Sequence, residues 1–496
     1  MTPICLVIPP SPFLLDERVF MSLGILRVAA VLEEAGVPVE VIDLSGIQNY
    51  AEAMRFHASQ SQAKIFAFTA TTPQMPTAFE LSRVVGKERP DARLILGGPH
   101  PTLTLAATKK EKVPGRATRA LNDLYSGFDV VVAGDGEQAI FDAIADVPPK
   151  LIDADDPKGK LFLTNARLNE MPFPARHLVD VGSYHYKIDG EPAVSLIAQL
   201  GCPFSCGFCG GRNSAMLRRV RTRTTENVVR EIVHLYKTYG VKGFMLYDDE
   251  LNVNPQMVEL MNAIGDAQEV LGVQFKLRGF IKSQLFTDEQ ARAMFRAGFR
   301  WILTGFESGS PRILENINKR ATRDENSRCV DIARRNGLKV KALMSMGHPG
   351  ESFKTLDETQ GWLLENRPDD FDVTIITPYP GSPYYDDAVL ENGSWVYTYP
   401  RTGDKLYAKE VDYLKTADYY KGDPNGGYVS YVWTDELSRE QLVLERDRIE
   451  REVRSSLGIP FNPGAAGIKF EHSMGQGLPE TILKKSAALD KKVFAA

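Results

Sequence analysis

Long apolar runs are missing from this sequence of 496 residues. No stretch approaches the roughly 20 consecutive apolar residues that a membrane-spanning helix needs, so no membrane span is expected. The N-terminus lacks a basic lead before a long apolar stretch, which argues against a secretory signal peptide. Basic charge is also sparse, because 59 Lys and Arg residues face 64 Asp and Glu residues, for a net charge of −5. Nucleic acid is therefore not expected as a partner.

Cysteine is scarce as well, with five residues in the chain. So few cannot form the disulfide framework of a secreted scaffold, and a reducing, cytoplasmic location is expected. Cys5 and Cys329 lie in apolar strand and helix patterns, and we predict that both are buried structural thiols. The other three, Cys202, Cys206 and Cys209, fall within eight residues. Their spacing needs a separate explanation.

Strand and helix patterns alternate through residues 1–145. The composition, 43% hydrophobic and 25% charged, is that of a globular protein, and the length predicts two or three domains. The strand patterns are Ile4–Ile8, Val39–Asp43, Ile65–Thr69, Arg93–Gly97 and Asp129–Ala133. Strands that alternate with helices predict a doubly wound parallel sheet. Ligands bind such sheets beyond the carboxyl ends of the strands.

Small and polar residues collect in the loops that follow these strands. The candidate ligand contacts are Thr71, Thr72, Gly97, Gly98, His100, Gly134, Gly136 and Glu137. Glycine lets a ligand approach the main chain closely, because it has no side chain. Each loop alone is better explained as an ordinary strand-to-helix turn, whereas together they suggest one large flat ligand. The basic stretch Thr104–Ser126 is predicted to be an insertion, with a lid as one option.

Residues 146–190 are rich in proline, glycine and charge, which is typical of a linker. A second alternating series fills residues 191–384. Its strand patterns are Ala193–Gln199, Gly243–Tyr247, Phe275–Gly279, Trp301–Phe306, Lys339–Met346 and Phe371–Thr377. These strands, with helical patterns between them, predict a partial (β/α)6 barrel, whose chemistry lies at the carboxyl ends of its strands.

The first strand of this barrel runs into the motif Cys-x-x-x-Cys-x-x-Cys, formed by Cys202, Cys206 and Cys209. Thiolates hold iron, and short gaps let one loop wrap one cluster. Three cysteines leave one iron of a cubane cluster free to bind the amino and carboxylate groups of a small molecule. A zinc site usually needs four ligands. A pair of buried thiols with one stray cysteine is the simplest structural alternative.

This motif, placed directly after a barrel strand, resembles the signature of the radical S-adenosylmethionine superfamily. The supporting motifs are Tyr247–Asn252, Gly305–Ser310, Gly347–Glu351 and Pro378–Pro383. The last two are typical of members that carry a cobalamin domain, and the loops Gly97–Thr102 and Gly134–Glu137 resemble that domain itself. The resemblance covers about residues 1–385. It is to the cobalamin-dependent radical S-adenosylmethionine enzymes, which include class B methyltransferases.

The resemblance implies three cofactors: a 4Fe-4S cluster on the three cysteines, S-adenosylmethionine on its open iron, and cobalamin, as methylcobalamin, on the first sheet. Residues implied to contact S-adenosylmethionine are Phe208, Asp249, Arg278, Glu307 and Ser308. For each of them the alternative is a salt bridge or a core contact that closes the barrel. No Asp-x-His-x-x-Gly motif is present. We therefore expect Thr71 and Thr72 to cover the lower face of the cobalt without a histidine bond, with His100 as the available alternative.

The implied activity is methylation of an unactivated carbon of a small-molecule or natural-product substrate, by way of a 5′-deoxyadenosyl radical and methylcobalamin. One alternative is a radical enzyme that cyclises or oxidises its substrate without methyl transfer. Another is a cobalamin carrier or sensor whose cluster is structural. A flavodoxin or ferredoxin is implied as the electron donor, and no residue pattern names the substrate.

Residues 385–496 are expected to form a small C-terminal α+β domain, loosely similar to the one that walls the substrate pocket in such enzymes. Tyrosines crowd this segment and suit either recognition or the filling of an irregular core. A charged helix from about Ser438 to Ser456 is predicted to be a solvated amphipathic cover. The polar C-terminal end is predicted to lie along the surface.

Overall fold

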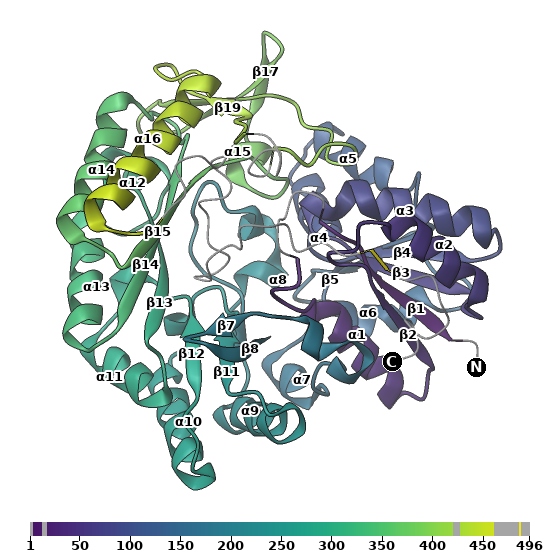
Figure 1. Ribbon diagram of the computed structural model, residues 1–496. Coiled ribbons are helices and arrows are strands. Elements are labelled where there is room, and N and C mark those ends of the chain that lie inside the picture. The colour runs from purple at the N-terminus through teal and green to yellow at the C-terminus, as the bar shows by residue number, and fades with distance from the viewer. Residues whose placement is uncertain (1–2, 12–16, 420–426, 461–485, 488–496) are drawn as a thin grey trace.

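Two groups of parallel strands lie side by side in the computed structural model, which describes residues 3–11, 17–419, 427–460 and 486–487. The N-terminal sheet is coloured purple to blue and the barrel teal to green (Figure 1). The course predicted for the C-terminal end falls almost wholly outside the described residues, as does Tyr420 in the tyrosine-rich segment. No helix within the described ranges is both long and apolar enough to cross a membrane.

The N-terminal sheet has six parallel strands in the order β2-β1-β3-β4-β5-β6. They are β1 (Ile4–Ile8), β2 (Val39–Asp43), β3 (Ile65–Thr69), β4 (Arg93–Gly97), β5 (Val130–Gly134) and β6 (Leu151–Ala154). The strand order reverses at β1, which confirms the doubly wound topology. β6 lies among residues expected in the linker, because four residues beside charged ones give only a weak strand pattern.

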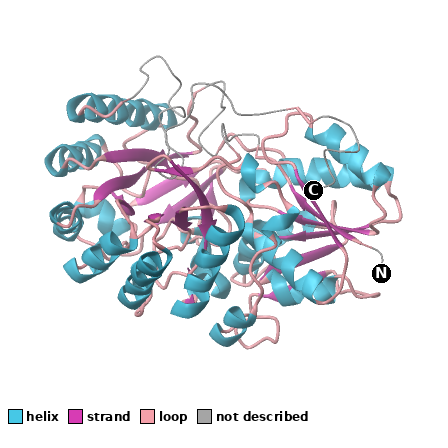
Figure 2. Cartoon of the chain, turned by 60° about the horizontal axis from the view of Figure 1, so that its bottom comes forward, coloured by secondary structure: helices cyan, strands magenta, loops and turns pink. Residues whose placement is uncertain are grey.

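Helices cover both faces of this sheet (Figure 2), because each face presents an apolar layer that must be buried. On one face pack α1 (Leu23–Glu34) and α6 (Gly136–Ala143). On the other pack α2 (Tyr50–Gln60) and α3 (Met75–Glu88). The carboxyl ends of the strands are left to the loops.

The prediction of an insertion at Thr104–Ser126 is wrong. These residues form the end of α4 (Pro99–Thr108) and α5 (Arg116–Leu124), the crossover between β4 and β5. Thr104 is fully buried, and its hydroxyl donates to the His100 carbonyl oxygen at 2.9 Å, so α4 is packed structure and not a lid. The basic composition comes from exposed lysines in the turn between the two helices.

The barrel has six parallel strands, as predicted. They are β8 (Glu191–Leu196), β11 (Gly243–Leu246), β12 (Lys276–Gly279), β13 (Trp301–Glu307), β14 (Lys339–Met346) and β15 (Asp370–Ile375). β8, β11 and β12 pair with one another, as do β13, β14 and β15. Two parallel bridges, Leu277 to Phe299 and Phe280 to Leu303, join the two groups. The outer helices are α9 (Thr225–Tyr239), α10 (Met257–Leu271), α11 (Asp288–Ala297), α13 (Arg323–Arg335) and α14 (Phe353–Asn366).

The C-terminal segment combines an antiparallel sheet with one long helix. The strands are β16 (Val389–Glu391), β17 (Ser394–Thr398), β18 (Lys405–Ala408) and β19 (Val432–Trp433), in that order. The helix, α16 (Arg439–Leu457), packs beside β15. α16 covers the barrel with one face, as predicted for an amphipathic helix, but its charges are not all solvated, because Arg446, Glu450 and Arg454 are fully buried.

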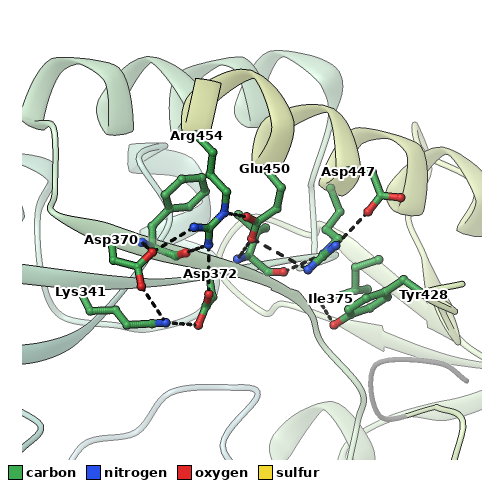
Figure 3. A network of polar contacts seen from close by, with 11 residues as sticks. Lys341, Asp370, Asp372, Ile375, Tyr428, Asp447, Glu450 and Arg454 are labelled. Carbon is green, nitrogen blue, oxygen red and sulfur yellow. Dashed lines mark hydrogen bonds and ion pairs between the residues drawn. The ribbon is translucent and has the colours of Figure 1, made fainter. Parts of the chain in front are cut away.

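These buried charges form an ion-pair network between α16 and the barrel (Figure 3). Arg454 contacts Glu450 at 2.7 Å, Asp370 at 3.0 Å and Asp372 at 3.3 Å. Lys341 on β14 pairs with Asp370 at 3.1 Å and Asp372 at 2.7 Å. Glu450 also accepts the Val373 amide at 2.7 Å. Because each carboxylate has a cation beside it, the helix can bury charge at the edge of β15.

Arg454→Met should destabilise the barrel, because three buried carboxylates lose a shared cation. Removing one partner of a buried ion pair typically costs ~3–5 kcal/mol. We expect a lower urea midpoint for unfolding, followed by tryptophan fluorescence. Arg451→Met is the matched control, since Arg451 is exposed on the same helix. Equal midpoints for the two variants would mean that the network contributes nothing to stability.

Candidate active site

The cysteine loop begins just past β8, at the carboxyl ends of the barrel strands, where we predicted the chemistry. Main-chain hydrogen bonds hold it on two sides. The Cys202 amide donates to the Leu217 carbonyl oxygen at 2.9 Å, and the Gly207 amide donates to the Ile317 carbonyl oxygen at 2.8 Å. The Tyr384 amide donates to the Gly207 carbonyl oxygen at 3.2 Å. The loop is therefore a fixed platform and not a free turn.

Gly207 is glycine for a steric reason. A Cβ atom at this position would lie 2.6 Å from Cε1 of Tyr384, well inside van der Waals contact. Tyr384 is buried, at 1% exposure, and its ring packs at 4.8 Å from the ring of Tyr397 on β17. Through Tyr397, the C-terminal segment thus packs behind the ring that lies on the cysteine loop.

The donor set of the loop fits a multi-iron cluster. Zinc–sulfur bonds of about 2.3 Å would place thiolates about 3.8 Å apart on a single zinc ion. Within the described residues, the ligand atoms of Cys202, Cys206 and Cys209 do not all lie within 4.8 Å of one another. Cys5 and Cys329 are buried in other parts of the molecule. Three spaced thiols suit a cubane cluster with one iron left open.

Thiolate ligation by this loop depends on positive charge from a metal. Desolvation raises the pKa of the Cys202 thiol to about 12, with the charges of Glu250 and Asp249 adding to the shift. The pKa of Cys209 is raised to about 11, first by desolvation and then by the charge of Cys206. A bound metal centre reverses this, because it stabilises the thiolate form.

Glu307 ends β13 in an unusual conformation. Its φ is +67°, a left-handed value that a side chain rarely adopts and that the surroundings must hold. Lys319 pairs with one carboxylate oxygen at 2.9 Å, and the Ser345 hydroxyl donates to the other at 2.7 Å. Burial alone would raise the pKa of Glu307, but the charge of Lys319 and these hydrogen bonds outweigh it and lower the pKa. Glu307 is thus kept ionised inside the protein.

A chain of buried hydrogen bonds links Glu307 to the cysteine loop. Nε2 of His348 lies 2.8 Å from the Ser345 hydroxyl, and Nδ1 lies 3.2 Å from the Tyr384 hydroxyl. Since the Ser345 proton goes to Glu307, Nε2 of His348 donates and Nδ1 accepts from Tyr384. Burial lowers the pKa of His348 to about 4, which keeps the ring neutral. The chain ends on the ring that packs against Gly207.

Sequence reasoning missed four residues of this hydrogen-bonded network around Glu307: Lys319, Ser345, His348 and Tyr384. His348 lies in the quoted motif Gly347–Glu351 but was given no role. A histidine beside a proline at a strand end was the available signal.

The other residues implied to contact S-adenosylmethionine have protein partners. Asp249 accepts the Gly201 amide at 3.1 Å, and the Ser308 hydroxyl lies 2.9 Å from that of Thr359. The Phe208 ring packs 5.4 Å from the ring of His348. Nη1 of Arg278 donates to the Tyr186 hydroxyl at 3.1 Å, inside a cluster that includes Met245 and Leu303. Their roles toward a ligand remain predictions.

The loops at the carboxyl ends of the strands of the N-terminal sheet, here called the rim, need their glycines for steric reasons. A Cβ on Gly98 would lie 2.7 Å from the Thr69 hydroxyl, and a Cβ on Gly134 would lie 2.2 Å from the Ala154 carbonyl carbon. Both have a φ of +100°. Neighbouring strands therefore require these glycines, whatever ligand approaches. Gly97 ends β4, and Gly136 begins α6.

The polar rim residues are mostly turned inward. His100 is 1% exposed on α4, and its Nδ1 lies 3.1 Å from the Thr72 hydroxyl. Burial lowers the pKa of His100 to about 3. Glu137 is buried, 3.5 Å from Arg27, whereas Thr71 is exposed at the end of β3. The exposed hydroxyl and main chain of the rim are compatible with a ligand, and His100 is held by Thr72.

The rim and the cysteine loop meet. A Cβ on Gly210, which follows Cys209, would lie 3.4 Å from Cδ1 of Leu103 on α4. Arg221 of the barrel pairs with Asp135 of the rim at 2.6 Å, and both side chains are buried. The Ser214 hydroxyl donates to Asp155 at 2.8 Å. These contacts join the carboxyl ends of the strands of the N-terminal sheet to the cysteine loop of the barrel.

Gly207→Ala should weaken iron binding, because the added methyl group collides with Tyr384. Overpacking of this kind typically costs ~1–3 kcal/mol, or roughly thirtyfold in affinity at the middle of that range. Iron and labile sulfide per chain, measured after anaerobic reconstitution, report it. Gly210→Ala is the matched control, since its nearest neighbour is an ordinary contact at 3.4 Å. The steric explanation fails if the two variants bind iron equally well.

Family models match both halves of this site. Residues 17–144 match the B12 binding domain, and residues 196–363 match the radical SAM superfamily. The predicted family is thereby confirmed. So are the three predicted cofactors, because a radical SAM domain uses a 4Fe-4S cluster with S-adenosylmethionine, and a B12 binding domain holds cobalamin.

Two relatives are described as enzymes of different kinds. A protein of Pyrococcus horikoshii described as an uncharacterized methyltransferase is 28% identical over 407 residues, covering 78% of this chain and 83% of its own length. The anaerobic magnesium-protoporphyrin IX monomethyl ester cyclase of Rubrivivax gelatinosus is 26% identical over 367 residues, covering 68% of this chain and 62% of its own length.

A solved structure shares the whole architecture. The radical S-adenosylmethionine methyltransferase TsrM from Kitasatospora setae, with cobalamin and a [4Fe-4S] cluster bound, superposes with a TM-score of 0.64. The match covers 93% of this chain and 92% of TsrM at 17% identity, so it carries the fold alone. With both domain models matched in this order, the chain belongs to the radical SAM enzymes that carry a B12 binding domain.

Proposed function

We propose that this protein is a methyltransferase that adds a methyl group to an unactivated carbon of a small molecule. The observation that carries the proposal is the contact between the cysteine loop, at Gly210, and α4 of the B12 binding domain, at Leu103. Methyl transfer to a radical carbon needs both cofactor sites open to one substrate. Proximity of this kind is what a protein contributes to such chemistry.

The cofactors supply the radical and the methyl group, and the chain supplies position and the exclusion of water. Glu307 is the proposed anchor for the amino group or ribose hydroxyls of S-adenosylmethionine. It is suited to this role because Lys319 and Ser345 hold it ionised and fixed. Tyr384 and His348 are proposed to fix the position of Glu307 relative to the cysteine loop. They do so through the hydrogen bonds that join Tyr384 to His348 and His348 to Ser345.

A second candidate is cyclisation or oxidation without methyl transfer. The match to the cyclase of Rubrivivax gelatinosus favours this outcome, since that relative shares most of the two cofactor domains with this chain. The first candidate is supported by the methyltransferase relative, which matches over a longer part of this chain. Both use the same site, so they differ in product and not in geometry.

The experiment that separates these candidates follows the methyl group. The reconstituted holoenzyme receives S-adenosylmethionine labelled at the methyl group, reduced flavodoxin or ferredoxin as the proposed donor, and a small-molecule extract. We expect the label in methionine, which keeps the methyl group of the cleaved S-adenosylmethionine, and in one methylated product, with 5′-deoxyadenosine and S-adenosylhomocysteine formed in equal amounts. That ratio arises because one S-adenosylmethionine makes the radical and another restores the methyl group.

Other outcomes overturn the proposal in distinct ways. 5′-Deoxyadenosine with no label beyond methionine supports cyclisation or oxidation. Labelled product without 5′-deoxyadenosine indicates polar methyl transfer. No cleavage of S-adenosylmethionine under strong reductant indicates a carrier or sensor. A variant with Cys202, Cys206 and Cys209 all changed to Ala is the control and should form neither nucleoside.

The lower face of the cobalt should lack a histidine bond, because Thr72 and burial hold His100 inside α4. In the electron paramagnetic resonance spectrum of protein loaded with cob(II)alamin, we expect no nitrogen splitting from a side chain. With a pKa of about 3, His100 stays neutral at higher pH, so the spectrum should not change between about pH 6 and pH 8. Nitrogen splitting that disappears in His100→Gln would contradict this.

A further inference from the structure

Cys5, Glu40 and His57 converge at the opposite end of the N-terminal sheet. Sγ of Cys5 lies 3.4 Å from Nε2 of His57, which lies 3.2 Å from a carboxylate oxygen of Glu40. Among the described residues, this is the one group of three such side chains whose ligand atoms all lie within 4.8 Å of one another. None of the three belongs to the site described above.

The fold brings these residues together from three elements. Cys5 and Glu40 are register partners on the parallel strands β1 and β2, so their side chains share one face of the sheet. α2 covers that face, and His57 lies in its last turn. Since the crossover helix runs back along the strands, its last turn lies over their starts. β1 rises ~3.3 Å per residue, which puts the cluster roughly 10 Å from the carboxyl end of the strand.

The distances match those around a tetrahedral metal ion. A zinc ion bonds sulfur at about 2.3 Å and nitrogen or oxygen at about 2.0–2.2 Å, which places its ligand atoms about 3.3–3.6 Å apart. The separations of 3.4 Å and 3.2 Å are close to these values. Thiolate, imidazole and carboxylate are also the donors that zinc prefers. We propose that Cys5, Glu40 and His57 bind one zinc-like divalent cation.

Burial and orientation support this site. Cys5 is fully buried, whereas the side chains of His57 and Glu40 are 11% and 29% exposed. The thiol of Cys5 is therefore the innermost ligand of the cluster. The partly exposed carboxylate of Glu40 leaves access from solvent for the ion and for a water as fourth ligand. The Ser61 hydroxyl donates to Glu40 at 2.6 Å, which orients the carboxylate from outside, as outer partners of metal ligands do.

The local electrostatics favour a cation. The last turn of a helix presents carbonyl oxygens and a partial negative charge, and His57 lies in that turn of α2. A divalent ion bound here would be balanced by the thiolate and the carboxylate, with the thiol proton released to solvent. The nearby cation Arg89 is held by the Ser61 carbonyl oxygen and by Asp91.

The bound ion would tie β1, β2 and α2 together. This role concerns the stability of the B12 binding domain and no step of methyl transfer. The competing explanation is a metal-free cluster, in which a neutral thiol and a histidine share a hydrogen bond beside a carboxylate. The two explanations predict different metal contents for the same protein.

The test uses the holoenzyme with its iron–sulfur cluster in place, so that Cys202, Cys206 and Cys209 are occupied. Zinc is added, unbound metal is removed by gel filtration, and the metal content is measured by mass spectrometry. We expect about one zinc ion per chain beyond the iron, as for one site with three protein ligands and a water. With Co2+ in place of Zn2+, a thiolate-to-cobalt charge-transfer band should appear.

Cys5→Ser and His57→Gln should each weaken zinc binding by roughly tenfold or more, since even outer partners of ligands change affinity by 10–100-fold. Cys5→Ser should also remove the charge-transfer band. Cys329→Ser is the matched control, because it changes another fully buried thiol outside the cluster and should retain zinc. Glu40→Gln, at a partly exposed position, covers the case in which a core variant fails to fold, and unchanged iron content shows that a variant is folded.

The proposal is overturned if the wild-type holoenzyme retains no zinc, or if the folded Cys5→Ser and Glu40→Gln variants retain as much as the wild type. Neither result depends on methyl transfer. Failure of the proposed function would leave the zinc measurement unchanged.

Discussion

The packing of Tyr384 against Gly207 holds the cysteine loop at the place where the two sheets meet. With no side chain at Gly207, the ring lies directly on the loop backbone, and a main-chain hydrogen bond joins the same two residues. The other side of the loop is fixed by the carbonyl oxygen of Ile317 and by the contact of Gly210 with Leu103. Two parts of the barrel and α4 of the B12 binding domain thus hold one loop, and Tyr397 of the C-terminal segment packs on Tyr384 behind it.

Buried charges are paired at two of the places where these parts join, because an unpaired charge inside a protein is costly. Asp135 and Arg221 join the rim to the barrel, and Arg454 joins α16 to the edge of β15. The same rule serves the candidate active site, where Lys319 keeps Glu307 ionised. His100 and His348 are buried without a charged partner that outweighs desolvation. Burial therefore lowers their pKa values below the usual range. Both rings are therefore neutral hydrogen-bonding groups.

Two candidate metal sites in this chain differ in the type of their donors and in the separation of their ligand atoms. The three loop thiols are spread too widely for one ion and suit a cluster of several irons, whereas Cys5, Glu40 and His57 converge on a single point. The sequence distinguished the first by its short spacing. It treated Cys5 only as a buried thiol, which the structure confirms, because its partners lie far along the chain on β2 and α2.

The sequence by itself determined both parallel sheets, the cysteine motif and most of the succession of strands and helices, with β6 and the crossover over Thr104–Ser126 as exceptions. Apolar periodicity and spacing within one loop are local properties, and they survive without knowledge of any partner. Only the tertiary structure decided which side chains meet: Glu307 with Lys319, Ser345 and, through His348, Tyr384. It also decided that Thr69 and Ala154 require Gly98 and Gly134, and that one face of α16 is buried. These outcomes depend on contacts between residues that are distant in sequence. The residues next to a charged side chain or a glycine do not show which distant residue it will contact.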